Sequence, residues 1–317
     1  MGARFHYLFI CKQRRGVAVM GKGSPMEKDK TQFLADIQRG KIGGVILWRG
    51  KSLINGEPIV AVACKIADAN KSANTKTGAM VQTFILPDPK PHGIECNGNK
   101  PAKIKAWLER TGARSICGDC PHAWQYDPAL DRYKKGSCYV REYQSPAAVL
   151  GAVYRESYPV AGVDFPKRWI ADIVAGLSVR LGSYGDPAAV PAMIWARLVS
   201  KAKSRTGYTH QWDSAHDKAR LNAFYMRAFL MASCDSVADY NAATRTGFRA
   251  FLVTPRGDAS PRENMTLCPA SSEFEELHGR KTSCVNCGLC SGSKGKGENK
   301  KSVFIPAHGA TANRVGN

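Results

Sequence analysis

An alternation of short apolar runs with helical segments, which begins at about residue 113, constrains the fold more than any other feature of this sequence. The predicted strands and strand ends, with predicted helices between most of them, lie at 176–182, 206–212, 229–234, 248–253, 265–269 and 302–309. Parallel neighbouring strands need a crossover connection, and a helix between two short loops supplies one. We therefore predict an α/β fold with a mostly parallel sheet, which is either open or closed into a complete or partial (β/α) barrel.

Polar and reactive residues follow four of these strands. Asp186, His210, the pair Cys234-Asp235, and Cys268 each stand where a predicted strand ends. Asp186 and Asp235 also suit the N-cap positions of the helices that follow, which would give them a purely structural role. In a barrel, however, all these positions converge on the face where active sites lie. We therefore favour the barrel and predict catalytic roles for Asp186, His210, Cys234 and Asp235.

The sequence before residue 113 lacks this alternation of strands and helices. Residues 1–40 predict a tail followed by a short helix, and residues 41–90 predict a β-meander that ends at Pro87, Pro89 and Pro91. The βα repeat then occupies residues 113–309, and 310–317 form a tail. The pattern leaves open whether the meander is a separate domain or a cap on the barrel. It also leaves open whether residues 1–19 belong to the native protein, because Met20 or Met26 offers an alternative start.

The C-terminal cysteines form the strongest chemical motif. Cys284, Cys287 and Cys290 are spaced as C-x2-C-x2-C, and Cys268 precedes them by fifteen intervening residues. This spacing is typical of iron–sulfur ligands, and four cysteines also suit a tetrahedral zinc ion. The chain has eleven cysteines and no secretory signal, so a disulfide scaffold is not expected. We therefore predict a metal site here and leave iron–sulfur and zinc open.

A second cysteine motif lies further upstream. Cys117 and Cys120 form a C-x2-C pair, and Cys138 follows after seventeen residues. Three cysteines can hold an iron–sulfur cluster with one open position, or a zinc site completed by His122, Cys96 or Cys268. A redox-active C-x2-C pair is the alternative, and the two motifs can also share ligands in one site.

The charge of the chain indicates its partners. Lysine and arginine exceed aspartate and glutamate by 46 to 26, which gives a net charge of +20. Such a surplus favours contact with nucleic acid. No apolar stretch is long enough for a membrane helix, so we expect a cytoplasmic protein without membrane contact.

Seven short sequence motifs occur in this order along the chain: ICGDCP, GSCYV, VRLGSYGDPAAVP, TGYTHQW, MASCDS, CPAS and CVNCGLCSG. From about Gly43 to Gly309 the chain resembles an uncharacterised cysteine-rich family of phages and prophages. More distantly, it resembles phage proteins with radical-SAM-like iron–sulfur barrels, which implies S-adenosylmethionine as a candidate cofactor. The sequence lacks the C-x3-C-x2-C run of radical-SAM enzymes, and this departure argues against cleavage of S-adenosylmethionine.

Two functions from different classes follow. The first is a phage-type, radical-SAM-like iron–sulfur enzyme, with a [4Fe–4S] type of cluster, that acts on nucleic acid or a nucleotide-derived substrate. In this enzyme Arg180, Tyr208 and Gln211 contact the substrate, His210 is the general acid–base, and Cys234 is either a reactive thiol or a core residue. The second is a basic, zinc-stabilised nucleic-acid-binding protein without catalysis. Neither the substrate nor the oligomeric state can be inferred from the sequence.

Overall fold

A computed structural model of the chain describes residues 25–67, 76–96, 103–293, 301–308 and 312–314. The predicted tail before residue 25, most of the basic segment 293–301 and most of the tail 310–317 lie outside this described part. Every helix in the described part is too short or too polar to span a bilayer.

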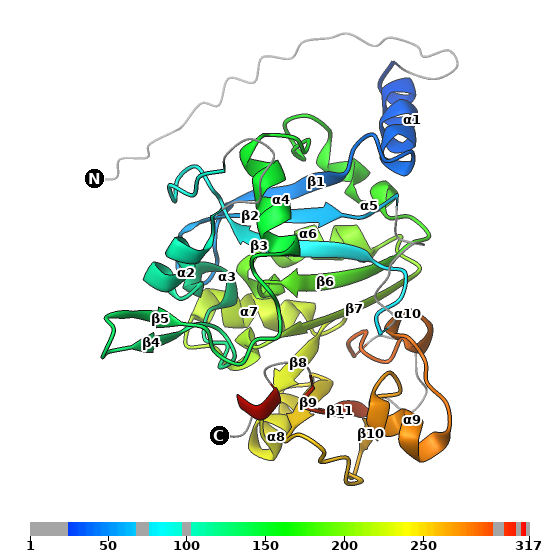
Figure 1. Cartoon of the computed structure of the whole chain (residues 1–317). Coiled ribbons are helices and arrows are strands. Elements are labelled where there is room, and N and C mark those ends of the chain that lie inside the picture. Colours follow the sequence, from blue (N-terminus) through cyan, green and yellow to red (C-terminus); the bar gives the residue numbers. More distant parts are fainter. Residues whose placement is uncertain (1–24, 68–75, 97–102, 294–300, 309–311, 315–317) are drawn as a thin grey trace, which may run out of the picture.

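A sheet of nine strands runs through the molecule in the order β1-β2-β3-β6-β7-β8-β9-β11-β10 (Figure 1). The first three strands pair antiparallel, and every later pair of neighbours is parallel. The strands are β1 (Gly44–Lys51), β2 (Pro58–Cys64), β3 (Val81–Pro87), β6 (Ser178–Tyr184), β7 (Ser204–Thr209), β8 (Met231–Cys234), β9 (Ala250–Thr254), β10 (Met265–Leu267) and β11 (Ser302–Pro306). A separate hairpin pairs β4 (Gln125–Asp127) with β5 (Arg132–Lys134). The α/β fold with a mostly parallel sheet and an N-terminal meander is therefore confirmed.

The meander is continuous with the parallel part of the sheet. β3 pairs with β2 on one side and with β6 on the other, through the parallel register Val81 to Val179. β2, β3 and the first half of β1 are almost wholly buried, which explains their near-continuous apolar sequence. β1 and β10 stand at the two ends of the sheet and do not pair with each other within the described residues, so the sheet is open.

The helices connect successive strands of the parallel part. Ser145-Pro146 begins the helix predicted there, and Ser236 caps another by accepting a hydrogen bond from the Asp239 amide at 3.0 Å. The helix predicted from Asp186 is split into a 3-10 turn and a helix by Pro191, which cannot continue the hydrogen-bond ladder. The helices are α1 (Pro25–Gln38), α2 (Lys105–Thr111), α3 (Arg114–Cys117), α4 (Ser145–Tyr154), α5 (Ile170–Ile173), α6 (Ala192–Val199), α7 (Asp217–Met226), α8 (Val237–Arg245), α9 (Ser272–His278) and α10 (Cys284–Cys287), with 3-10 turns η2 (Lys167–Trp169), η3 (Pro187–Ala189), η4 (Gln211–Asp213) and η5 (Ala312–Arg314).

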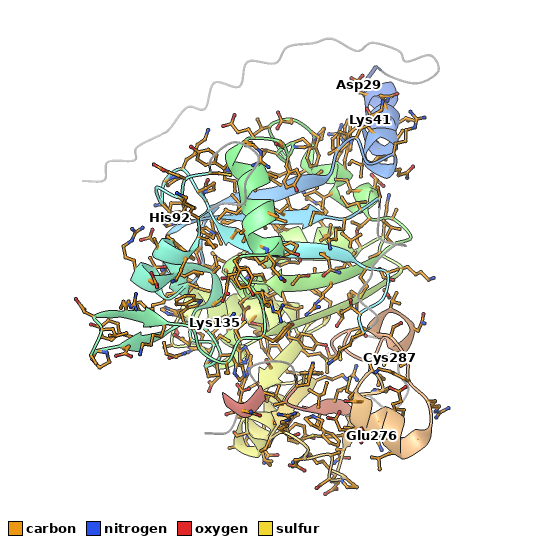
Figure 2. All side chains as sticks on the ribbon, viewed as in Figure 1. Asp29, Lys41, His92, Lys135, Glu276 and Cys287 are labelled. Atoms are coloured by element: carbon orange, nitrogen blue, oxygen red, sulfur yellow. The ribbon has the colours of Figure 1, made fainter. Side chains whose placement is uncertain are left out.

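The parallel strands present two different faces because their side chains alternate. Val179, Leu181 and Leu252 belong to the main core, together with buried residues of α6, α7 and α8. The intervening side chains, such as Arg180 and Val253, line a cavity instead. Figure 2 shows all side chains and places Cys287 and Glu276 beside the C-terminal strands, with Asp29 of α1 at the far end of the molecule. The sheet therefore separates a packed apolar core from a face that is free to build a site.

Asn222 of α7 provides a test of this packing. Its buried amide donates hydrogen bonds to the carbonyls of Ala188 at 3.0 Å and Val190 at 2.8 Å, and its Oδ1 accepts one from the Ala192 amide at 2.8 Å. We predict that Asn222→Ala lowers the free energy of unfolding by about 2–4 kcal/mol, because three backbone groups lose their partner. Urea denaturation measures this difference. The exposed neighbour Leu221 is the control, and Leu221→Ala should change it by less than about 0.5 kcal/mol; equal losses would contradict the prediction.

Candidate metal centre and its cavity

A cavity of about 440 Å³ lies against one face of the parallel strands. Residues at or near the carboxyl ends of β6, β7, β8, β9 and β11 form its floor, and two loops close its sides. The polar, aromatic and cysteine side chains that line it include Lys76, Cys117, Cys120, His122, Ser137, Cys138, Tyr139, Arg180, Tyr184, Asp186, Tyr208, His210, Phe251, Cys284 and His308. Active sites of parallel α/β proteins lie at this edge of the sheet.

The upstream cysteine motif, formed by Cys117, Cys120 and Cys138, makes one wall of this cavity. α3 ends at Cys117, and the Cys120 amide then donates to the Cys117 carbonyl at 3.2 Å. The Cys138 amide donates to the His122 carbonyl at 2.8 Å, which brings the distant third cysteine beside the first two. Gly136 permits this approach, because a Cβ atom there would lie 2.1 Å from the Ala123 carbonyl oxygen. The three thiols predicted as ligands therefore line one cavity.

Two buried polar side chains hold this wall in place. Gln211 donates from Nε2 to the Cys117 carbonyl at 3.1 Å, and its side chain lies so close to Gly118 that no Cβ atom fits there. The Asp186 carboxylate accepts from the Thr209 hydroxyl at 2.7 Å, the His210 amide at 2.8 Å and the Ala188 amide at 2.9 Å. Burial raises the pKa of Asp186, although these hydrogen bonds oppose the shift. Gln211 and Asp186 thus position the site through the backbone.

Tyr184 brings an unpartnered hydroxyl to the same wall. Its side chain is 4% exposed, and its hydroxyl has no hydrogen-bond partner in the described structure. Burial raises its pKa well above the usual range, and the neighbouring Cys117, Glu142 and Cys138 act in the same direction. A buried hydroxyl without a partner costs free energy, so this position suits a bound group that the hydroxyl can contact.

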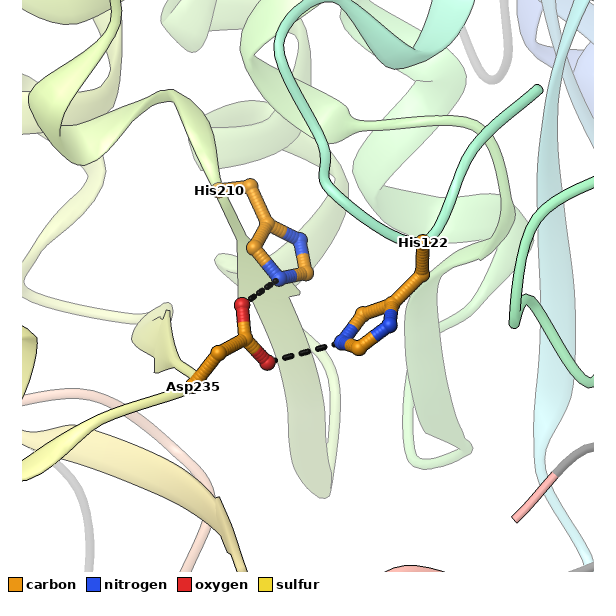
Figure 3. Close-up of side chains that lie close together, drawn as sticks. All are labelled: His122, His210 and Asp235. Carbon is orange, nitrogen blue, oxygen red and sulfur yellow. Dashed lines mark hydrogen bonds and ion pairs between the residues drawn. The ribbon is translucent and has the colours of Figure 1, made fainter. Parts of the chain in front are cut away.

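His122, His210 and Asp235 form a compact group at the edge of the cavity (Figure 3). His122 Nε2 lies 2.7 Å from Asp235 Oδ1, and His210 Nε2 lies 3.2 Å from Asp235 Oδ2. Burial disfavours the Asp235 charge, but the two imidazoles together hold the pKa of Asp235 well below its usual range. Burial likewise opposes protonation of His210, yet Cys120 and Asp235 raise its pKa well above the usual range. The group therefore favours a carboxylate between two hydrogen-bonded rings.

The C-terminal cysteines lie on the other side of the cavity. Cys268, Cys284 and Cys290 share one apolar cluster with Val303 and Ile305, and Cys284 lines the cavity itself. Burial raises the pKa of Cys268 to about 11 and raises the pKa of Cys284, Cys287 and Cys290 as well.

Three cationic side chains oppose this effect of burial. Lys76 lowers the pKa of Cys268 and Cys284, Arg180 lowers that of Cys284, and Arg249 lowers that of Cys287. Cations close to buried thiols are suited to a site that becomes negative when the thiolates bind a metal.

The spacing of the sulfur atoms distinguishes between kinds of metal site. A single zinc ion with bonds of about 2.3 Å holds its thiolates about 3.8 Å apart. Among the histidine, cysteine, aspartate and glutamate side chains of the described residues, one group of three has ligand atoms that all lie within 4.8 Å of one another, and it consists of His122, His210 and Asp235. Any three cysteine sulfurs of the described residues therefore include at least one pair that is more than 4.8 Å apart.

The structure brings together most of the residues predicted from the sequence. Asp186, His210 and Asp235 converge, and Arg180 and Tyr208 line the same cavity; Gln211 supports it from behind. Cys234 is different, because its thiol is fully buried on the core face and is absent from the cavity lining. Sequence reasoning missed Tyr184 and the cations Lys76 and Arg249. Tyr184 was within reach, because it stands four residues after Arg180 on the same face of β6.

Comparisons with models of protein families, with curated proteins and with solved structures find no match for this chain. What the fold and the site define is an α/β protein with a mostly parallel nine-stranded sheet, a histidine–aspartate–histidine group and thiols from two motifs around one cavity.

The unpartnered hydroxyl of Tyr184 yields a prediction. In metal-free protein, Tyr184→Phe should raise the free energy of unfolding by about 1–2 kcal/mol, because it removes a buried polar atom without a partner. Urea denaturation after chelator treatment measures this. Tyr126→Phe is the control, since the Tyr126 hydroxyl is exposed and bonds Asp131 at 2.6 Å, and its removal should change stability little. A loss of stability in Tyr184→Phe would show that the hydroxyl has a partner in the metal-free protein.

Proposed function

We propose that this protein is an iron–sulfur enzyme whose substrate binds in the cavity between its two cysteine motifs. The observation that carries the proposal is the position of Cys117, Cys120 and Cys138, which line one wall of a cavity at the carboxyl edge of a parallel sheet. A site that only stabilised the fold would have no reason to border a cavity of this size.

The residues present fit an iron–sulfur cluster better than a zinc ion. Among the described residues no three cysteine sulfurs all lie within 4.8 Å of one another, as ligands of one zinc ion would, and a cluster of several metal ions separates its thiolates further than one ion does. Tyr184 adds a buried hydroxyl without a partner beside Cys117 and Cys138. A cluster held by three thiolates has one iron without a protein ligand, and that iron can bind a small molecule such as S-adenosylmethionine.

The other walls of the cavity suit a substrate with an anionic group. The Arg180 guanidinium donates a hydrogen bond to the Tyr139 hydroxyl at 2.5 Å. The groups that raise its pKa are Tyr139, Tyr208 and Cys284, and no described carboxylate is among them. A half-buried guanidinium without a carboxylate partner favours binding of an anion. Tyr208 and Phe251, whose ring centroids lie 4.5 Å apart, add an aromatic surface to the same cavity. A nucleotide-derived substrate offers both a phosphate and a flat ring.

We further propose that the parallel part of the sheet is a partial barrel of the radical-SAM-like type. Three features support it: the run of parallel strands from β3 to β10, the helices packed in the core on one face, and the cavity on the other. The loop that carries Cys117, Cys120 and Cys138 also lies between β3 and β6, which are adjacent parallel strands. On this proposal, Cys268, Cys284, Cys287 and Cys290 hold a second cluster, with Lys76, Arg180 and Arg249 balancing its charge.

The net charge of +20 supports a second candidate function, a zinc-stabilised protein that binds nucleic acid without catalysis. In such a protein both cysteine motifs would hold zinc, and affinity for nucleic acid would fall steeply with salt concentration. The cavity and the group around Asp235 would then have no assigned role, which is why we place this candidate second.

Metal analysis of protein purified without oxygen tests the proposal. We expect brown protein with iron and acid-labile sulfide, at roughly four of each per cluster. Cys117→Ser and Cys284→Ser should each remove one cluster, and the double variant should remove both, because each substitution removes a ligand of a different cluster. Visible absorbance and iron content measure these losses without any assay of activity.

Cys64→Ala is the matched control, because Cys64 is buried in β2 and does not line the cavity. It should keep the full iron content. Colourless protein with stoichiometric zinc, and salt-sensitive binding to nucleic acid, would overturn the enzyme proposal in favour of the second candidate. If one serine variant alone removed all the iron, the two motifs would share a single site.

A further inference from the structure

We propose that His122, His210 and Asp235 form a separate binding site for a single divalent metal ion, with open positions toward the cavity. This inference does not depend on the iron–sulfur proposal, because it uses nitrogen and oxygen ligands alone. It assigns to His210 and Asp235 a role as ligands, in place of the acid–base role expected for His210 and the catalytic role expected for Asp235 from the sequence.

The distances within the group match those between neighbouring metal ligands. In an octahedral site with bonds of about 2.1 Å, adjacent ligand atoms lie about 3.0 Å apart. The two nitrogen–oxygen separations of 2.7 Å and 3.2 Å fall on either side of this value. The two ring centroids lie 5.6 Å apart at 72°, so both rings direct Nε2 toward the carboxylate without stacking (Figure 3). Two histidines and one carboxylate are the ligand set of many divalent metal sites with free positions.

The ligands are held by contacts outside the group. Ser137 Oγ lies 2.5 Å from His122 Nδ1, the ring nitrogen that faces away from Asp235. The backbone amide of His210 donates to Asp186, and the backbone amide of Asp235 donates to Asp239 at 3.1 Å. Metal-binding histidines usually have such a partner on their second nitrogen, because it fixes the ring and its tautomer. Each ligand thus comes from a different segment that is anchored independently.

The group is open on the side of the cavity. The side chains of His122, His210 and Asp235 are 20%, 18% and 25% exposed, and both histidines line the cavity. A metal ion held by three ligands at such a position keeps sites for water or substrate. The ligand set suits Mn²⁺, Fe²⁺, Co²⁺ or Zn²⁺, and Mn²⁺ is the useful probe because it prefers carboxylate and imidazole over thiolate.

Titration of chelator-treated full-length protein with Mn²⁺, monitored by the electron paramagnetic resonance of the free ion, tests this inference. We expect one tightly held Mn²⁺ per chain. Asp235→Asn and His122→Gln should each weaken binding by at least about tenfold, since each removes or neutralises a ligand. Cys117→Ser should leave Mn²⁺ binding unchanged, and this result separates the site from the iron–sulfur proposal.

His216→Gln is the matched control. His216 Nε2 lies 3.5 Å from Asp119 Oδ1, so it also pairs with a carboxylate, but no second histidine of the described chain completes a group there. Circular dichroism checks that each variant is folded, and the His122 and Asp235 variants test the site independently of each other. Failure of the wild type to retain Mn²⁺, or equal binding by wild type and both variants, would overturn the inference and leave a hydrogen-bonded relay.

Discussion

The buried carboxylate of Asp186 is the interaction on which the rest of the site depends. It joins the end of β6, the turn η3 and the end of β7 through its bonds to the Ala188 amide, the Thr209 hydroxyl and the His210 amide. Its own backbone amide donates to the Ile116 carbonyl at 2.6 Å, one residue before Cys117. Hydrogen bonds to Asp186 therefore fix the positions of both the cysteine loop and His210. Burying a carboxylate is costly without such bonds, so the structure around Asp186 is strongly constrained to keep them.

The cysteine motifs illustrate how burial and charge oppose each other around the cavity. Burial raises the pKa of Cys138 to about 11 and that of Cys117 well above its usual value, so thiols at this wall hold their protons strongly in the metal-free protein. On the opposite wall Lys76, Arg180 and Arg249 favour the thiolate forms. If the cysteines bind a metal as we propose, binding would release the thiol protons and add positive charge, and so remove the penalty on both walls. On that proposal, assembly of the metal centre would be coupled to the stability of this half of the protein.

Strand ends could be read from the sequence because carboxyl ends of parallel strands meet at one edge, and Asp186, His210 and Asp235 follow that rule. Alternation within a strand was not applied to Cys234, although its neighbour Ser233 lines the cavity and Asp235 bonds the cavity residues His122 and His210, so that Cys234 must face the core. The insertion of β11 between β9 and β10 could not be predicted, because it depends on pairing of Thr266 and Phe251 with residues far along the chain. Nor could the proximity of Lys76 to the C-terminal cysteines, which the hydrogen bond from the Cys284 amide to the Lys76 carbonyl brings about between segments far apart in the sequence.

The two sides of the cavity differ in charge, and this polarity limits how a substrate can lie. Arg180 and Lys76 stand on the side of Cys284, whereas the Asp235 carboxylate stands beside Cys120. An anionic group binds best at the cationic side, since its charge is then balanced by a guanidinium that has no carboxylate of its own. The remainder of the molecule must then extend past the aromatic surface of Tyr208 toward His210 and Cys117. One end of the substrate is thus held by charge while the other end reaches the thiols and the histidine–aspartate–histidine group, where the chemistry that we propose takes place.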